Sequence, residues 1–551
     1  MEEMEELSHW NDWPTDKGFD PEYEQREPVE LAVTGTIPAY TAGVLYRTGP
    51  GKSHIKADNG ETLQISHWFD GFTQNHRFQI VADDLNGSSR VFYNSRFSTD
   101  DLIQKAIETG SLKGLGFAEG RDPCQSVLGK VQSEFIPQPT PSSKNVGVTL
   151  SINFPGLDNK DKNDSSSRWN NPQGVRTLYA KTDYNAFQKI DPETLEPLGL
   201  ASQLDLHPEL KGPVTASHTR SDPTTGDVFN YNLTLGSACT YRVFKVSAAT
   251  GETTILATFD AQPAYLHSLL ITEDHVILCI WNAHLDPRKM AESFMHAILP
   301  TDPTQPALWY VIDRKGDNGL IATYESPAFF CFHTINAWIE PSEKDASQID
   351  IVADLVRADN TDLIHSLYYK NLISSLDTAK SFQNNRSESI KTSITRFRLP
   401  SVPRTPSTDV KKATLEWSDL KFLSPELPTI NPAKGTRKHR YVYAVTMRGM
   451  GTLTDGIMKL DCDTREGHVW ISRGDSPGEP IFVADPEGTN EDDGVLLSVV
   501  LDGSRGKSYL LCLDARNLLK LGQANIDGAV GLGFHGQHVP AAVGMPTGDY
   551  Y

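Results

Sequence analysis

The segment Asp222-Pro-Thr-Thr-Gly-Asp-Val-Phe-Asn-Tyr-Asn-Leu-Thr234 joins a polar turn to an apolar run that has the length and residue types of a β-strand. Gly226 can adopt the positive φ angle that such a turn requires, and Asp222 can cap the turn through its side chain. The segment therefore predicts one corner of an antiparallel hairpin.

The same corner recurs along the chain, which extends the prediction from one hairpin to the whole fold. Similar turns occur at Ala248–Gly251, Asp313–Gly316 and Asp463–Gly467, with variants at Asp191–Leu195 and Asp514–Leu518. Strand-like runs lie at Tyr241–Val246, Thr254–Phe259, His275–Trp281, Leu308–Asp313, Arg440–Thr446, Val495–Leu501 and Ser508–Asp514. Repeated hairpins of this kind indicate an all-β protein, either a β-propeller or a large sandwich.

Helical periodicity is confined to two short segments, Asp100–Thr109 and Pro287–His296. Four polar segments are expected to form surface loops, because their composition cannot bury a core. These segments are 137–144, 157–174, 376–392 and 400–414. Strand signals resume on both sides of each segment, so we expect a single domain over residues 1–551.

The composition disfavours several classes of protein. The chain of 551 residues has 51 Lys and Arg against 71 Asp and Glu, a formal net charge of -20. This balance argues against nucleic acid binding, which needs clustered basic residues. The longest apolar stretches, such as Val276–Trp281, are too short to span a membrane, and the acidic start Met1–Trp10 lacks the apolar core of a signal peptide. We therefore expect a cytoplasmic protein, and no obligate protein partner is evident.

Four of the sixteen histidines lie in or at the end of largely apolar runs: His218, His267, His333 and His535. A buried imidazole needs partners for both ring nitrogens, and a metal on one with a carboxylate or carbonyl on the other meets that need. Taken singly, each such histidine is more often a core residue. Their spacing matches no local metal motif, but it permits convergence on a propeller axis. An all-imidazole set suits Fe, Cu, Zn or Ni.

A rival metal signal is His284-Leu-Asp286, an H-x-D match of the kind found in 2-His-1-carboxylate iron sites. The tripeptide is common by chance and stands before a Pro-Arg loop. The P-loop pattern G-x-x-x-x-G-K-[ST] and the zinc protease pattern H-E-x-x-H are absent from the sequence. Their absence disfavours a P-loop kinase and a zinc protease.

At the four histidines the chain resembles the carotenoid cleavage oxygenase family, which also includes the retinal pigment epithelium isomerohydrolase. The resemblance covers nearly the whole chain and rests on blocks that follow one another in the family's order. These blocks are Gly35–Pro38, Gly43–Pro50, His67–Gly71 with His76, Asp122–Cys124, Lys189–Glu196, Glu479–Val483, Glu491–Val500 and Phe534–Gly536. The opening segment Trp10–Tyr23 is most similar to fungal carotenoid-cleaving or torulene-cleaving members.

The resemblance implies a single seven-bladed β-propeller with Fe(II) on its axis and a cap of loops and short helices over one face. It implies that His218, His267, His333 and His535 are the iron ligands, and that O2 is the co-substrate. The implied reaction cleaves one conjugated carbon–carbon double bond of a carotenoid into two carbonyl fragments. No protein nucleophile or general acid is needed, so none is assigned.

The family also has three acidic residues that hydrogen-bond the ligand imidazoles. Glu426 and Glu479 match two of them, and Asp183 stands where many members have Glu. Asp is one methylene shorter, so we expect a longer or water-mediated hydrogen bond there. His67 and His76 match family positions that are not ligands, and we expect them to pack or to form hydrogen bonds.

An apolar polyene substrate needs an aromatic-lined tunnel. The candidates are Phe92, Phe97, Phe117, Phe329 and Trp338. The family's apolar entrance corresponds to residues 112–131, which predicts peripheral membrane contact, with Cys124 as a candidate for acylation. His439, within the basic run Arg437–Arg440, is expected at the surface or at a strand end.

Three alternative functions stay open. A stilbene-cleaving member of the family would need polar groups in the tunnel, and Tyr93 and Lys130 are the candidates. The second alternative is the isomerohydrolase chemistry of the family. The third is a propeller that serves as a non-enzymatic binding scaffold, which the intact set of four histidines disfavours.

Overall fold

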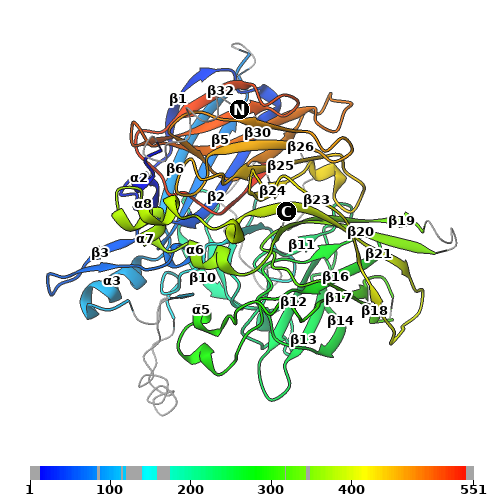
Figure 1. Ribbon diagram of the computed structural model, residues 1–551. Helices are drawn as coiled ribbons and strands as arrows, with labels where there is room; N and C mark the ends of the chain where they lie inside the picture. The colour runs from blue at the N-terminus through cyan, green and yellow to red at the C-terminus, as the bar shows by residue number, and fades with distance from the viewer. Residues whose placement is uncertain are drawn as a thin grey trace.

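A computed structural model describes residues 13–83, 87–112, 116–118, 139–157, 174–316, 318–342 and 348–541. Most of these residues lie in strands, and the helices are few and short, so the prediction of an all-β fold is confirmed. The sheets stand around a common centre in a propeller-like arrangement (Figure 1).

Five sheets have the size of propeller blades, with four or five strands each. The first two contain β7 (Thr149–Ile152), β8 (Leu178–Lys181), β9 (Phe187–Ile190) and β10 (Pro197–Ala201), then β11 (Arg220–Ser221), β12 (Val228–Thr234), β13 (Thr240–Val246) and β14 (Thr253–Asp260). The third contains β15 (Leu270–Ile271), β16 (His275–Ile280), β17 (Ala307–Asp313), β18 (Leu320–Ser326) and β22 (Val410–Lys412). The last two contain β19 (Thr334–Pro341), β20 (Ile349–Ala358), β21 (Thr392–Val402) and β23 (Thr414–Asp419), then β24 (Pro425–Thr429), β25 (Tyr441–Thr446), β26 (Gly456–Asp461) and β27 (Gly467–Trp470).

The remaining large sheet has ten strands and joins both ends of the described chain. It contains β28 (Asp475–Pro477), β29 (Ile481–Ala484), β30 (Gly494–Asp502), β31 (Lys507–Asp514), β32 (Lys520–Asn525), β1 (Val29–Gly35), β6 (Arg90–Phe97), β5 (Thr73–Val81), β2 (Gly43–Pro50) and β33 (His535–Pro540). The expectation of seven separate blades is therefore corrected to five blade-sized sheets in the described residues. The reason is β1, which pairs with β6 through Val29–Leu31 and with β32 through residues 32–35, so that these strands form one sheet.

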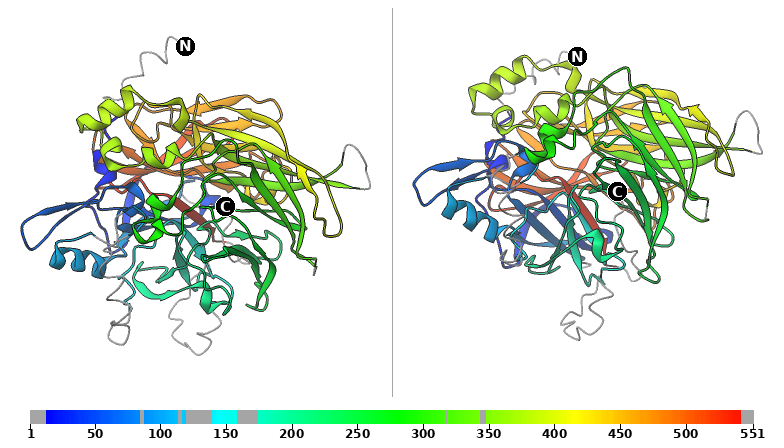
Figure 2. Two further views of the ribbon diagram at one scale, coloured as in Figure 1. Left: turned by 60° about the horizontal axis from the view of Figure 1, so that its bottom comes forward. Right: turned by 90° about the horizontal axis from the view of Figure 1, so that it is seen from below.

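Two further groups of elements lie outside these sheets. The strands β3 (His54–Lys56) and β4 (Thr62–Gln64) form a small hairpin. Four short helices lie near one another at one side of the sheets (Figures 1 and 2). They are α2 (Asp16–Phe19), α6 (Asp362–Ser366), α7 (Tyr369–Leu372) and α8 (Asp377–Asn384). No helix in the described parts of the chain is long and apolar enough to cross a membrane.

The hairpin corner at Asp222 forms as predicted. Its carboxylate accepts hydrogen bonds from the backbone N–H groups of Thr224 and Thr225, at 2.7 and 2.9 Å, and Gly226 has a φ of 74°. At the later corner the capping residue is Asp461 and not Asp463, and Arg465 takes the positive φ. In both corners an Asp carboxylate caps the turn, so the predicted type of turn is correct. At the second corner the capping Asp lies two residues earlier than predicted.

The helix predictions have mixed outcomes. The segment Asp100–Thr109 forms helix α3, as expected. The segment Pro287–His296 does not form one helix. It contains only a 3-10 turn, Lys289–Ala291, and the start of α5 (Phe294–Ala297), which begins anew because the Ser293 hydroxyl accepts a hydrogen bond from the N–H of His296.

The four segments expected as loops also differ from one another. Segment 376–392 holds helix α8, and segment 400–414 holds β22 and the end of β21. The other two, 137–144 and 157–174, lie partly or mostly outside the described residues.

Four short strands bring the sheets together at the centre. The strands β11, β15 and β19 each stand at the edge of their own sheet, and β33 ends the ten-stranded sheet. His218 and Ser268 form a bridge that links the β11 and β15 segments. The starts of these edge strands are the positions of the four histidines selected from the sequence.

Candidate metal centre

The four histidines converge in one buried cluster. His218, His267 and His333 precede β11, β15 and β19 by one to three residues, and His535 is the first residue of β33. One nitrogen of each imidazole can be chosen so that all four lie within 4.8 Å of one another. Because every one of these side chains is buried, the cluster is shielded from bulk solvent.

The Nε2 atom of His535 lies 3.0 Å from Nε2 of His218 and 3.2 Å from Nε2 of His333. With metal–nitrogen bonds of about 2.1 Å, these separations correspond to ligands about 90–100° apart, narrower than the tetrahedral angle of a closed zinc site. The four histidines therefore fit a metal ion that keeps further coordination positions open.

Carboxylates hold three of the four imidazoles by their Nδ1 atoms. Nδ1 of His333 lies 2.5 Å from Oε2 of Glu426, and Nδ1 of His535 lies 2.8 Å from Oε1 of Glu479. A carboxylate accepts a hydrogen bond from an N–H group, so Nδ1 carries the hydrogen and the lone pair of Nε2 points to the centre of the four-histidine cluster. Converging lone pairs repel one another unless a cation lies between them, which is the second observation that fits a metal.

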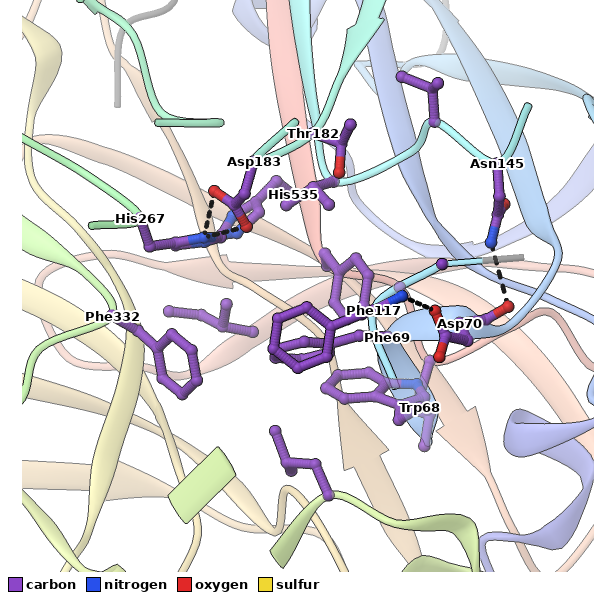
Figure 3. A pocket seen from close by; sticks show the side chains of 18 of the residues that line it. Trp68, Phe69, Asp70, Phe117, Asn145, Thr182, Asp183, His267, Phe332 and His535 are labelled. Carbon is purple, nitrogen blue, oxygen red and sulfur yellow. Dashed lines mark hydrogen bonds and ion pairs between the residues drawn. The ribbon is translucent and has the colours of Figure 1, made fainter. Parts of the chain in front are cut away.

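Asp183 supports His267 directly. Nδ1 of His267 lies 3.0 Å from Oδ1 and 2.9 Å from Oδ2 of Asp183 (Figure 3). Two further groups fix the carboxylate: the Ser217 N–H donates to Oδ1 at 3.0 Å, and the Tyr265 hydroxyl donates to Oδ2 at 2.9 Å. The contact is therefore direct and not mediated by water. At 2.9 and 3.0 Å it is longer than the 2.5 and 2.8 Å contacts of Glu426 and Glu479, as expected for the shorter Asp side chain.

A buried cation stands behind Glu479. Nη1 of Arg47 lies 3.6 Å from Oε2 of Glu479, and the Gly536 N–H donates to the same oxygen at 2.8 Å. Burial raises the pKa of Glu479 to about 7, while Arg47 and the Gly536 N–H act in the opposite direction. The arginine therefore offsets part of the cost of burying this carboxylate as an anion.

Burial also acts on the imidazoles. It lowers the pKa of His218 and of His535 well below the usual value for histidine, and the neighbouring imidazoles lower both further. Only neutral imidazole can bind a metal through Nε2. These two side chains are therefore held in the protonation state that a metal requires.

An apolar cavity of about 420 Å³ adjoins the cluster. His267, His333 and His535 form part of its wall, together with Asp183 and Glu426. Most of the remaining wall is aromatic or aliphatic, as Figure 3 shows around Phe69, Phe117 and Phe332. The wall includes Trp68, Phe69, Phe117, Phe294, Phe332, Phe534, Leu363, Leu367, Met447, Leu453 and Leu532. An elongated apolar molecule could thus lie beside the four imidazoles.

The aromatic residues named from the sequence lie in different places. Phe117 lines the cavity, whereas Phe92 and Phe97 lie on β6 and are not part of its wall. Phe329 packs against Trp309 and Phe397, and Trp338 packs against His439 and the guanidinium of Arg396. Trp68, Phe69, Phe294, Phe332 and Phe534 line the cavity and were missed. A usable signal was adjacency, since Phe332 and Phe534 directly precede His333 and His535.

His67 and His76 form hydrogen bonds elsewhere and take no part in the four-histidine cluster. Nε2 of His67 lies 2.9 Å from the carbonyl oxygen of Ile364, and its Nδ1 accepts the N–H of Phe69. Nδ1 of His76 lies 2.9 Å from the hydroxyl of Tyr93. The rival pair His284 and Asp286 takes no part in the cluster, and Arg288 binds the Asp286 carboxylate through two hydrogen bonds.

Of the two positions expected for His439, the surface is wrong, whereas the residue does lie near a strand end, two residues before β25. The side chain is 1% exposed, and its Nε2 lies 3.2 Å from Oδ2 of Asp354. These two residues form a second buried group with Cys462, but Arg396 donates to both carboxylate oxygens of Asp354, at 2.8 Å each. A guanidinium in that position already neutralises the carboxylate, so we interpret the group as a structural ion pair network.

The proposed membrane entrance cannot be placed. Of residues 112–131, the structure describes only 112 and 116–118, and Cys124 lies outside the described residues, as does Lys130. Tyr93 is buried beneath His76 and Phe78 and does not line the cavity.

Comparisons with known proteins find relatives over nearly the whole chain. The family model described as retinal pigment epithelial membrane protein matches residues 18–540. A carotenoid dioxygenase of Neurospora crassa is 40% identical over 564 residues, covering 97% of this chain and 92% of the relative. A torulene dioxygenase of Gibberella fujikuroi is also 40% identical, covering 97% of this chain and 95% of the relative.

Solved structures share the fold. A variant of the apocarotenoid oxygenase of Synechocystis superposes with a TM-score of 0.71 at 20% identity, covering 97% of this chain and 99% of that one. The cobalt-substituted form of the same oxygenase superposes with a TM-score of 0.70. At this identity the likeness concerns the arrangement of the strands.

Proposed function

Because the chain belongs to the retinal pigment epithelial membrane protein family, which includes carotenoid oxygenases, we propose that it is an iron(II)-dependent dioxygenase that uses O2 to cleave a conjugated double bond of a carotenoid. The observation that carries this proposal is the contact between the four-histidine cluster and the apolar cavity. The products would be aldehydes or apocarotenals. The names of the two fungal relatives support torulene or a related polyene as substrate.

Iron is the metal that we propose for the centre. Four neutral imidazoles leave the charge of a divalent ion uncompensated, and their spacing leaves coordination positions open. When bound there, iron(II) would supply the redox chemistry that brings O2 to react with an electron-rich double bond. His218, His267, His333 and His535 would hold the ion, and Asp183, Glu426 and Glu479 would orient three of the rings.

The rest of the chain would bind and position the polyene. The ring of Phe69 contacts the rings of both Phe117 and Phe332 along the cavity, and Phe332 also contacts the ring of His267. An apolar wall of this kind excludes water and restricts a rigid polyene to few orientations. We infer that the aromatic wall selects the double bond that lies beside the centre, while no side chain needs to donate or accept a proton.

Two finer features of the fold belong to the same proposal. We propose that the ten-stranded sheet represents two blades joined through β1, which would give seven blades in all. We also propose that the short helices form a cap over the cavity, since Leu363 of α6 and the nearby Leu367 contribute to its wall. Peripheral membrane contact near residues 112–131 stays a prediction, which co-sedimentation with liposomes would test.

A stilbene substrate is less well supported. The relatives that cover most of this chain at 40% identity are named for carotenoid and torulene, and Tyr93, a candidate for holding a phenol group, lies outside the cavity wall. We therefore expect resveratrol to be a poor substrate.

One experiment tests the proposal. The protein is reconstituted with Fe(II) under anaerobic conditions and then incubated in air with β-carotene, torulene, an apocarotenal or resveratrol, and the aldehydes are identified by mass. We expect one equivalent of iron and aldehyde products from at least one polyene. A protein that binds no Fe(II), or that cleaves resveratrol and no polyene, would overturn the proposal.

A further inference from the structure

A buried carboxylate ties two separate parts of the cavity wall together. Asp70 ends the 3-10 turn Trp68–Asp70, whose two aromatic residues line the cavity, and its side chain is 1% exposed. Its Oδ1 accepts a hydrogen bond from the N–H of Phe117 at 2.5 Å (Figure 3). Its Oδ2 accepts a hydrogen bond from the N–H of Ala118 at 2.7 Å. Both carboxylate oxygens therefore grip the backbone of the segment that carries the Phe117 ring.

Gly116 and Asn145 restrict the position of Asp70 relative to this segment. A Cβ on Gly116 would lie 2.1 Å from Oδ1 of Asp70, so only glycine allows the segment to approach so closely. On the other side, the side-chain amide of Asn145 donates to the carbonyl oxygens of Asp70 and Gly71, at 3.0 Å each. Asp70 is thus held from behind by Asn145 while it holds the Phe117 segment in front.

The Phe117 ring lies between the carboxylate of Asp70 and the four-histidine cluster (Figure 3). Its centroid is 5.2 Å from that of Phe69 and 5.8 Å from that of Tyr265, whose hydroxyl donates to Asp183. The Met295 N–H donates to the carbonyl oxygen of Phe117 at 2.9 Å, which fixes the segment against α5. A shift of the Phe117 backbone would therefore move part of the aromatic wall. This part contacts Tyr265, which donates to Asp183, the carboxylate that is bonded to His267.

We propose that Asp70 is a positioning residue which fixes the depth of the polyene in the cavity through Phe117, and so helps to determine which double bond is cleaved. This inference rests on the proposed function. The physical basis is that hydrogen bonds from backbone N–H groups to a buried carboxylate are stronger than neutral ones and fix both distance and direction. A rigid polyene has several nearly equivalent double bonds, so a displaced wall changes the one that lies beside the centre.

The test compares Asp70→Asn with a matched variant, Asp101→Asn. Asn keeps the size of Asp70 but replaces one acceptor by an NH2 group that faces a backbone N–H. Asp101 also ties down a nearby segment, through the hydroxyls of Thr140 and Ser142, but it is exposed and lines no part of the cavity. For Asp70→Asn we expect KM to rise about tenfold, the effect of losing one charge-assisted hydrogen bond, with a changed ratio of cleavage products. Asp101→Asn should match the wild type in both.

Two further measurements separate positioning from a general loss of structure. Iron content and circular dichroism should be those of the wild type in Asp70→Asn. Phe117→Leu alone should also change the product ratio, and Asp70→Asn added to it should change the ratio no further, because both act through the same ring. Additive changes, or an unchanged product ratio in Asp70→Asn while Phe117→Leu alters it, would overturn the proposal.

A binding assay keeps this test independent of catalysis. A polyene bound beside Trp68 and Phe117 quenches tryptophan fluorescence, and this signal needs no metal and no turnover. If the wild type binds a polyene but cleaves none, the proposed function fails. Weaker quenching in Asp70→Asn than in Asp101→Asn would still support the positioning role of Asp70. Equal polyene affinity in these two variants would count against it.

Discussion

Nδ1 of His267 lies 2.9 Å from one carboxylate oxygen of Asp183 and 3.0 Å from the other. The same carboxylate is fixed by the Ser217 N–H and the Tyr265 hydroxyl. A side chain one methylene shorter than Glu thus reaches the ligand directly, because two donors hold it in position.

Asp183→Asn should weaken metal binding. The amide is a poorer acceptor for the Nδ1 hydrogen of His267, and the loss of such support lowers metal affinity by about 10–100-fold. Metal affinity is measured by competition with a coloured chelator. Asp183→Glu is a second variant. Its added methylene would crowd the Ser217 N–H, the Tyr265 hydroxyl and Nδ1 of His267, which already lie at hydrogen-bond distance. We expect this crowding to lower the free energy of unfolding by about 1–3 kcal/mol. Full metal affinity in Asp183→Asn would contradict the role assigned to this carboxylate.

His333→Ala should abolish stoichiometric metal binding and oxygenase activity, since it removes one of four converging nitrogens and leaves Glu426 without its imidazole partner. Metal content after anaerobic reconstitution and aldehyde yield are the measurements. His296→Ala is the matched control, because the His296 side chain is exposed and takes no part in the four-histidine cluster. A His333→Ala protein with one equivalent of iron and full activity would refute the ligand assignment.

Metal removal should lower stability as well as activity. A metal that binds only the folded chain adds about 4 kcal/mol of stability when its free concentration is 1,000 times Kd. We therefore expect a chelator to lower Tm and to stop aldehyde formation. Adding Fe(II) should restore both properties, while Zn(II) should restore Tm alone, because zinc has no redox chemistry. Equal activity with Zn(II) would exclude a redox role for the metal.

Arg396→Met should destabilise the fold in a manner that depends on pH. Burial alone would raise the pKa of Asp354, but hydrogen bonds from Arg396 and His439 outweigh it and hold the pKa below its usual value. In the wild type this pair therefore contributes stability above the pKa of unfolded Asp, about 3.9, and loses that contribution as the pH falls through the lower folded value. Without Arg396 the buried carboxylate keeps only His439 as a partner, and removing one partner of a buried ion pair costs about 3–5 kcal/mol at neutral pH.

The destabilisation should become smaller in acid. In Arg396→Met the carboxylate can protonate, so the difference from the wild type should shrink when urea unfolding is compared at pH 7 and at about pH 4.5. The guanidinium of Arg396 lies over the rings of Trp338 and Trp417, and the Met side chain would fill part of that space. Adding Asp354→Asn to Arg396→Met should recover stability at neutral pH. A loss of equal size at both pH values would show that packing and not charge carries the effect.

The four-histidine cluster and the all-β class could be predicted from the sequence, but the shape of the cavity could not. The four histidines could be named because each stands beside an apolar run, and the family resemblance selected them from the sixteen. Phe329 and Phe332 show where this reasoning ends. They belong to one apolar run, yet Phe332 lines the cavity and Phe329 packs against Trp309. Which aromatic side chain faces a cavity depends on how strands from distant parts of the chain are placed, and no local pattern encodes that.

His439 illustrates the same limit for polar residues. Its place in a run of basic residues favours solvent, but its partner Asp354 lies on β20, in a different sheet. The number of separate sheets was also beyond local patterns, because the join between β6 and β32 is made by a single strand that changes partner midway.

The pairing of β33 with β2 has a consequence for the order of folding. Thr48 and His535 are partners across these strands, although almost the whole described chain separates them. Contacts between such distant segments carry a large loop-closure cost and form late. A growing chain can thus arrange three of the histidines before it can supply the fourth. The metal would then be taken up tightly only by molecules whose last strand has docked, which makes metal uptake a signal that the ring has closed.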